Sequence, residues 1–363
     1  SCSISDAGGR LVCLAEGLPI HVASSGLVAR TMVELFDDIR PGDCFLNNSP
    51  YYGNTHHADH TMSVPVFFEG EHLFTTLARA HQADCGNTQP TTYMPFAPDL
   101  YQEGALDFPC VRVQRDYRDV EDVVRMARMR IRVPEQWYGD FLAAVGACRI
   151  GEREIAGLCG KYGVETVKAF LDEWQEYGRR RMVEAIRQLP RGRWRNESQL
   201  DPFPLVADQG IHVRLKMTID PEEGFITLDF TESDDAVPGG LNMSEATVLA
   251  AGITGVLNNL DPTLPQNDGA FSRIRFVTRE NCVVGPVEHP ACASMATTTV
   301  ADRVINVVQS CFAKLGGKTG MAEGALGMPA SCSVISGVDP RRAGAPYINQ
   351  LTIGGLGLSL IHI

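Results

Sequence analysis

Two short clusters of histidine and aspartate carry the side chains of this sequence that are best suited to chemistry. They are Thr55-His56-His57-Ala58-Asp59-His60 and Ala80-His81-Gln82-Ala83-Asp84. Five of the nine histidines lie between His56 and His81. Imidazole nitrogen and carboxylate oxygen are ligands of divalent metals. The same side chains also cap turns and satisfy buried carbonyl groups, so a metal site requires a fold that brings the two clusters together.

The segment between the clusters predicts one β-hairpin, because two apolar-rich stretches flank a turn at Gly70. Asp59 lies eleven residues before Gly70, and His81 lies eleven residues after it. An antiparallel pairing about the turn therefore sets Asp59 almost opposite His81. His56 is three residues before Asp59, close enough for a turn to fold it into the same place. Two imidazoles and one carboxylate on one rim, with positions left for water or substrate, outline a divalent-metal site.

The remaining histidines and acids of the clusters have two possible roles. His57, His60 and Asp84 are candidates for partners that orient the metal ligands, or for a general base. Among these three we assign catalysis to Asp84 and His57. The alternative is that they only stabilise the turns at the end of the hairpin.

A run of turn-forming residues, Asn47 to Asn54, precedes the first cluster. Asn, Ser, Pro and Gly make tight turns, which alone explains the run. Its amides and tyrosines suit a polar substrate equally well. The candidate substrate-binding residues are therefore Asn48, Tyr51 and Asn54, together with Gln82 beside the second cluster.

Composition excludes several classes of protein. The chain has 363 residues and a formal net charge of -12, which argues against nucleic acid as a ligand because phosphate binding requires a basic face. No apolar run approaches the roughly 18 residues of a membrane helix, and the N-terminus lacks a secretory signal. The eleven cysteines are scattered without a Cys-x-x-Cys pair. We expect reduced, mostly buried cysteines in a cytoplasmic protein with no membrane partner.

Both ends of the sequence predict a fragment of a longer protein. The chain enters strand-like sequence at once, at Arg10 to Leu14, and it stops after a glycine-rich stretch from Gly354 with a short apolar tail.

The order of patterns predicts a mixed α+β protein with three parts. Residues 1–118 are strand-rich and carry the candidate metal site, residues 119–190 are helical and pack on them, and residues 191–363 form a second α+β domain, truncated at its C-terminus. The expected helices cover residues 119–132, 134–159, 164–190, 245–259 and 300–315. Residues 211–219 alternate apolar and polar side chains, and 225–230 follow after a turn, so both stretches predict strands.

The sequence contains no phosphate-binding loop and no dinucleotide fingerprint. It therefore predicts no nucleotide site formed by a motif of this chain.

Several motifs of the sequence resemble those of a known protein family. Residues 46–59, from Leu46-Asn47-Asn48-Ser49-Pro50 to Asp59, resemble the N-terminal signature of the hydantoinase B/oxoprolinase family. Residues 79–86 and 264–269 are similar to later motifs of the same family. The chain departs from the family pattern at Ser49, Asn54 and Gln82, where Asp, Gly and His are frequent. These departures lie beside the candidate ligands and bear on the substrate.

The resemblance implies a two-subunit reaction. An actin-fold ATPase partner, of the hydantoinase A type, consumes ATP to phosphorylate the carbonyl oxygen of a small-molecule substrate, and the B-type subunit completes the reaction at a divalent metal. The family's metal ligands fall on His56, Asp59 and His81. A site of two histidines and one aspartate suits Mn, Zn or Fe. The expected assembly is a hetero-oligomer.

Three hypotheses follow for function. The first is a subunit of an ATP-dependent hydrolase of cyclic amides such as hydantoin, 5-oxoproline or a lactam, with Asp84 as general base or as the residue that orients a ligand histidine. The second is a subunit of an ATP-dependent carboxylase of ketones such as acetone or acetophenone. The third is a non-catalytic assembly partner of the ATPase, which the intact set of candidate ligands argues against.

Overall fold

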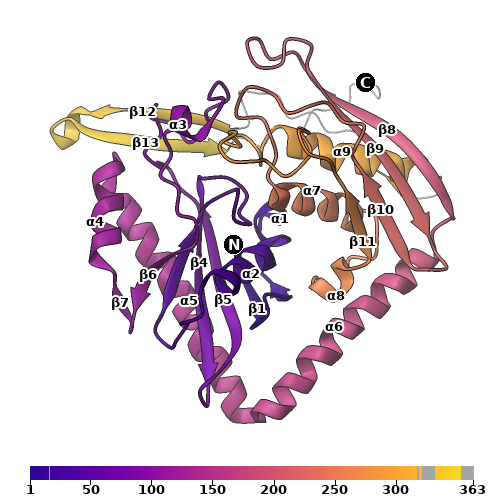
Figure 1. Cartoon of the computed structure of the whole chain (residues 1–363), viewed down its shortest axis with the longest axis horizontal. Coiled ribbons are helices and arrows are strands. Elements are labelled where there is room, and N and C mark those ends of the chain that lie inside the picture. The colour runs from indigo at the N-terminus through magenta and orange to yellow at the C-terminus, as the bar shows by residue number, and fades with distance from the viewer. Residues whose placement is uncertain (16, 317–318, 321–331, 353–363) are drawn as a thin grey trace.

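The computed structural model describes the chain except for residues 16, 317–318, 321–331 and 353–363. The glycine-rich end from Gly354 lies outside the described residues. Figure 1 shows two sheets, each with its own helices, and a long helix, α6, that runs from the base of the first sheet to the second. The α+β class predicted from the sequence is confirmed.

The first sheet has seven strands in the order β2-β1-β5-β4-β3-β6-β7. All neighbours pair antiparallel, and the predicted hairpin forms the centre of the sheet. The strands are β1 (Cys2–Asp6), β2 (Leu11–Leu14), β3 (Cys44–Asn47), β4 (Asp59–Phe68), β5 (Glu71–His81), β6 (Val111–Arg115) and β7 (Arg118–Asp119). Three short helices lie in this part: α1 (Pro19–Val22), α2 (Ser25–Leu35) and α3 (Leu100–Glu103).

The helical section predicted after residue 118 is confirmed within a few residues at each end. It consists of α4 (Glu121–Arg130), α5 (Pro134–Tyr162) and α6 (Val164–Arg187). Proline stands at the first turn of α5, where its missing N–H costs nothing. Helix α5 covers one face of the hairpin, where Met62 and Val64 of β4 pack with Trp137 and Phe141 in one apolar layer.

The second sheet has the order β11-β10-β9-β8. Its strands are β8 (Gly192–Leu200), β9 (Ile211–Asp220), β10 (Phe225–Asp229) and β11 (Ile274–Val277), and its helices are α7 (Glu245–Leu257), α8 (Asp268–Phe271) and α9 (Val300–Ala313). The alternation predicted for β9 is confirmed, with every second residue buried. Met182 and Ile186 of α6 belong to this second core. The division proposed at residues 118 and 190 stays a prediction.

The C-terminal described elements form a separate two-stranded hairpin, β12 (Cys332–Asp339) and β13 (Ala345–Thr352), with a short 3₁₀ helix, η1 (Pro340–Arg342), at its tip. Among the described residues, none of the helices combines the length and apolar character needed to cross a bilayer. The structure describes the side chains of ten cysteines, which are all free, and eight of them are buried, in agreement with the expected mostly buried cysteines.

The register of the central hairpin depends on one extra residue. Phe68 pairs with Glu71 around a two-residue turn, and Phe67 pairs with His72, but Val66 pairs with Phe74. Leu73 is therefore a β-bulge. Without the bulge, the register set at the turn would place Asp59 opposite Ala80. The bulge shifts the pairing by one residue and sets Asp59 directly opposite His81. The pairing predicted by counting from Gly70 is confirmed, although the sequence pattern did not reveal the bulge that produces it.

Helix α6 makes a close contact with the short helix α8. The backbone at Gly178 of α6 lies so near Asn267 that a Cβ atom would overlap the Asn267 amide. That amide donates to the Trp174 carbonyl at 2.9 Å and accepts from the Ala270 backbone at 2.9 Å. Only glycine at residue 178 leaves room for both bonds.

We therefore predict opposite effects for two helical glycines. Gly178→Ala should lower the free energy of unfolding by about 1–3 kcal/mol through overpacking. Gly157→Ala on α5, where a Cβ would meet nothing within 4 Å, should raise it by up to about 1 kcal/mol, because alanine favours helix over glycine. Urea denaturation of both variants measures this difference. Equal shifts in the two variants would contradict the close packing of α6 on α8.

Candidate metal centre

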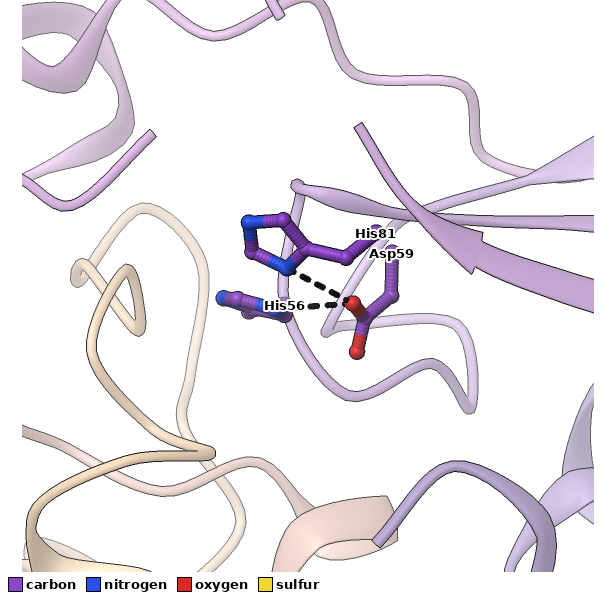
Figure 2. A group of neighbouring side chains, drawn as sticks. All are labelled: His56, Asp59 and His81. Carbon is purple, nitrogen blue, oxygen red and sulfur yellow. Dashed lines mark hydrogen bonds and ion pairs between the residues drawn. The ribbon is translucent and has the colours of Figure 1, made fainter. Parts of the chain in front are cut away.

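Three side chains meet at the open end of the hairpin, as Figure 2 shows. Oδ1 of Asp59 lies 3.0 Å from Nε2 of His56 and 3.1 Å from Nδ1 of His81. These ligand atoms all lie within 4.8 Å of one another. His56 and Asp59 are fully buried, whereas the side chain of His81 keeps 15% exposure. The group therefore opens toward solvent on the His81 side.

A tight turn before β4 brings His56 to Asp59. The Asp59 backbone N–H donates to the His56 carbonyl at 3.1 Å. The amide of Asn54 donates to the Asp59 carbonyl at 2.7 Å and to the His56 carbonyl at 3.2 Å, and it accepts from the Thr61 hydroxyl at 2.9 Å. Asn54, a predicted substrate-binding residue, is thus engaged with the backbone of the turn. Its contacts fix the candidate ligands in place.

The outer nitrogens of both imidazoles have partners that set the orientation of the rings. Nδ1 of His56 lies 2.8 Å from the Ser294 carbonyl, which can only accept, so this nitrogen carries a proton. Nε2 of His81 lies 3.0 Å from the Thr92 hydroxyl. Both inner nitrogens face Asp59. Fixing the outer nitrogen in this way is how proteins present a metal-binding imidazole.

Burial and charge act against each other at these groups. Burial would raise the pKa of Asp59, but His21 and His56 hold it well below its ordinary value. Burial would lower the pKa of His56, yet Asp59 raises it, whereas burial dominates at His81 and lowers its pKa. The carboxylate is therefore ionised and surrounded by imidazoles. This donor set, with both rings oriented from outside, fits a divalent cation such as Mn, Zn or Fe.

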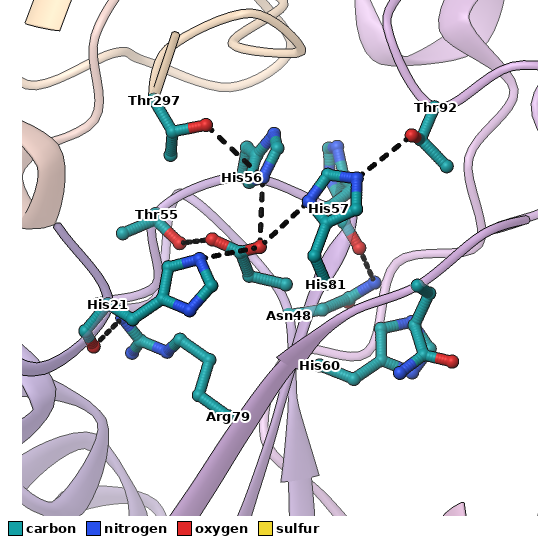
Figure 3. A network of polar contacts seen from close by, with 12 residues as sticks. His21, Asn48, Thr55, His56, His57, His60, Arg79, His81, Thr92 and Thr297 are labelled. Atoms are coloured by element: carbon teal, nitrogen blue, oxygen red, sulfur yellow. Dashed lines mark hydrogen bonds and ion pairs between the residues drawn. The ribbon is translucent and has the colours of Figure 1, made fainter. Parts of the chain in front are cut away.

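Two further residues of this site were not predicted from the sequence. Nε2 of His21, in α1, lies 3.4 Å from Oδ1 of Asp59, and Figure 3 shows its ring directed toward the same place as His56 and His81. Tyr93 stacks on both imidazoles, with ring centroids 6.3 Å from His56 and 5.4 Å from His81. Neither residue has a sequence signal that links it to the clusters, because only the fold brings α1 and the loop after β5 to them.

His57 points to a different set of partners. Its Nδ1 lies 2.9 Å from Glu103 and its Nε2 lies 3.7 Å from Asp107. Burial would lower the pKa of His57, but the Glu103 carboxylate raises it. Nε2 of His57 has no hydrogen-bond partner in the described part of the chain. The catalytic role assigned to His57 stays a prediction. Any such role would involve a ring that is held by the buried Glu103 carboxylate.

Asp84 is engaged elsewhere. Its carboxylate accepts from the Arg132 backbone at 2.5 Å, from the Arg132 guanidinium at 3.2 Å and from the Gly86 backbone at 3.0 Å. These bonds tie the loop after β5 to the start of α5. Within the described residues, none of the hydrogen bonds or ion pairs of Asp84 reaches His56, Asp59 or His81. The structure thus does not bring it to the centre as a free base.

The remaining predicted substrate-binding residues are also held by protein groups. The amide of Asn48 donates to the His57 and Leu106 carbonyls at 2.7 and 2.9 Å. Tyr51 donates to the Ala291 carbonyl at 2.9 Å, and Gln82 donates to the Ala80 carbonyl at 3.4 Å. Their substrate role stays a prediction. Both amide N–H groups of Asn48 are taken up by the His57 and Leu106 carbonyls, and its side-chain oxygen accepts from the Phe108 backbone at 2.6 Å.

His60 lies on the other face of β4. Successive side chains of a strand alternate between faces, so His60 enters the apolar layer under α5, where Trp137 donates to its Nδ1 at 3.3 Å. Burial lowers the pKa of His60 to about 3. It is therefore a neutral core histidine, and the hydrogen bonds of its ring in the described residues go to Cys85 and Trp137, not to the three-residue group.

The sequence as a whole matches one protein family. The family model of hydantoinase B/oxoprolinase covers residues 1–359. The chain belongs to the hydantoinase B/oxoprolinase family. The family resemblance seen in the motifs is confirmed.

The curated relatives of this family member include hydrolases and a carboxylase. It is 26% identical to the beta subunit of the caprolactamase of Pseudomonas jessenii, over 96% of this chain and 59% of that protein. It is 25% identical to 5-oxoprolinase 1 of Arabidopsis thaliana, over 87% of this chain and 27% of that protein. It is 25% identical to the acetophenone carboxylase delta subunit of Aromatoleum aromaticum, over 86% of this chain and 45% of that protein. The chain thus spans only part of the length of these relatives.

A solved relative has the same fold. The crystal structure of the ATP-dependent caprolactamase from Pseudomonas jessenii superposes with a TM-score of 0.85 at 24% identity, over 97% of this chain and 59% of the caprolactamase chain. Both sheets and their helices therefore belong to an architecture that this family member shares.

The buried state of His60 predicts how stability depends on pH. The unfolded chain holds this imidazole near a pKa of about 6.5, so below that pH the unfolded state binds a proton that the folded state excludes. The free energy of unfolding should fall by about 1.4 kcal/mol per pH unit on this account as pH drops from about 6.5 toward 3. His60→Gln, which can still accept from Trp137, should show a flatter dependence. Urea denaturation with a chelator present compares them, and identical slopes would contradict the assignment.

Proposed function

We propose that this chain is the metal-dependent part of an ATP-dependent cyclic-amide hydrolase, which acts on a substrate phosphorylated by a partner ATPase subunit. The observation that carries the proposal is the convergence of His56 Nε2, Asp59 Oδ1 and His81 Nδ1 within 4.8 Å. Membership of the family supports it, as do the names of relatives such as the caprolactamase beta chain and 5-oxoprolinase 1.

The residues of the centre divide the work of binding and orientation. A divalent cation held there would supply Lewis acidity, to polarise the activated carbon–oxygen centre of the phosphorylated substrate or to lower the pKa of a water molecule. His56, Asp59 and His81 hold the cation, and the Ser294 carbonyl and Thr92 hydroxyl keep the two imidazoles in place. The substrate approaches from the His81 side, since His56 and Asp59 are shielded from solvent.

The names of the relatives support a partner subunit. The sequence has no nucleotide-binding motif of its own, while the solved caprolactamase is described as ATP-dependent. Several relatives are named as single subunits of larger enzymes, among them one of a D-/L-hydantoinase from a Pseudomonas species. We infer a hetero-oligomer in which an actin-fold ATPase subunit consumes the ATP.

The second candidate is an ATP-dependent ketone carboxylase subunit. It is favoured by the match to the acetophenone carboxylase delta subunit and by Asn54 and Gln82, which stand where the family frequently has Gly and His. In that enzyme His56, Asp59 and His81 would hold the same cation, which would supply positive charge beside the oxygen of the ketone. A non-catalytic assembly role is the third candidate.

We expect removal of a candidate ligand to abolish tight metal binding. His81→Ala and His56→Ala should weaken the binding of Mn²⁺ or Zn²⁺ by at least about 100-fold, because loss of a direct ligand costs more than loss of an orienting partner. His72→Ala, at the turn end of the same hairpin, serves as the matched control and should bind as the wild type does. Chelator competition measures the affinities. Negligible binding by the wild type and by His81→Ala alike would contradict the proposed metal.

Turnover by the assembled complex separates the three candidates. The full-length protein, coexpressed with its neighbouring ATPase gene, should hydrolyse ATP in the presence of hydantoin, 5-oxoproline or caprolactam and open the ring. His81→Ala in the same complex should lose ring opening. Bicarbonate-dependent consumption of acetone or acetophenone with no lactam opened would favour the carboxylase, and unchanged ring opening by His81→Ala would favour the assembly role.

A further inference from the structure

The carboxylate of Asp59 has more neighbours than the two histidines predicted to share a metal with it. Thr55 donates to its Oδ2 at 2.5 Å, and Nε2 of His21 lies 3.4 Å from its Oδ1. All of these groups are buried: His21 is 6% exposed, and Thr55 and Asp59 are 0% exposed. We propose that His21 is a positioning residue, which fixes the Asp59 carboxylate in the orientation that directs Oδ1 toward His56 and His81. This inference rests on the proposed metal centre.

The direction of the contact follows from the chemistry of the two groups. Nε2 of His21 lies at ion-pair distance from Oδ1, and an ionised carboxylate only accepts hydrogen bonds, so His21 stabilises Oδ1 in the form that carries a proton on Nε2. With Thr55 on Oδ2 and His21 on Oδ1, both oxygens are held from the protein side. A ligand carboxylate bonded in this way keeps one orientation whether or not the cation is present.

His21 is itself tied to the hairpin by a second contact. Its backbone carbonyl accepts from Nη1 of Arg79 at 2.6 Å, and Nε of Arg79 donates to the Thr61 hydroxyl at 2.7 Å. Arg79 is 3% exposed and lies two residues before His81, on the same face of β5. Figure 3 shows Arg79 beneath His21. Both the ring and the backbone of His21 are therefore fixed relative to the strands that carry the candidate ligands.

His21 acts through Asp59 because it is not one of the converging donors. In the described part of the chain, the atoms that lie within 4.8 Å of one another come from His56, Asp59 and His81, without His21. Partners of this kind typically change metal affinity by about 10–100-fold when they are lost. The contribution of His21 should therefore appear in the affinity for the cation.

The experiment compares three variants of the whole chain with Mn²⁺ as the probe. His21→Leu removes the N–H donor and should weaken Mn²⁺ binding by about 10–100-fold. His21→Gln places an amide N–H near the position of Nε2 and should restore most of the affinity. His72→Leu, on the same hairpin but far from Asp59, should bind as the wild type does. Electron paramagnetic resonance of free Mn²⁺ gives the affinities, and thermal unfolding without metal shows that each variant is folded.

Two outcomes would overturn the role of His21. One is a His21→Leu variant that binds Mn²⁺ as tightly as the wild type while His81→Ala does not, which would leave the metal centre intact as a proposal. The other is an equal loss in the Leu and Gln variants with unchanged thermal stability. If His21→Leu does not fold, His21→Asn replaces it, because its shorter amide does not reach Asp59 and should lose affinity relative to His21→Gln. A wild type that binds no Mn²⁺ would contradict the metal centre itself.

Discussion

The pairing of β4 with β5 is the constraint on which the rest of the centre depends. Side chains of a strand alternate between faces, so a shift of one residue moves every side chain to the opposite side. The bulge at Leu73 supplies the one residue that sets Asp59 opposite His81. The apolar layer under α5 then keeps that register, because a shift would place Met62 and Val64 on the polar face.

A fully buried carboxylate is costly unless cations or hydrogen bonds compensate it. At Asp59 the compensation comes from distant parts of the chain: Thr55 from the turn, His21 from α1 and His81 from β5. The segment around Ser294, from the second half of the molecule, orients His56. The centre therefore depends on segments far apart in the chain, from His21 to Ser294.

Relatives of this chain carry different names, among them caprolactamase and acetophenone carboxylase. Two of the three residues predicted to depart from the family pattern, Asn54 and Gln82, bond to backbone carbonyls near the centre. An effect of these residues on the substrate would therefore act through the shape of the loops that carry the candidate ligands. Asp84 would also act through a loop, because its hydrogen bonds to Arg132 hold the loop after β5.

The sequence by itself determined the α+β class, the long helices, the alternating strand β9 and the hairpin that carries Asp59 and His81, because periodicity and spacing are local properties of the chain. The exact opposition of these two residues depends on the bulge at Leu73. Only the tertiary structure decided the rest. It placed His60 in the core, turned His57 toward Glu103, tied Asp84 to Arg132 and brought His21 to Asp59. These outcomes depend on which distant segments pack together, and no local pattern in one sequence encodes those contacts.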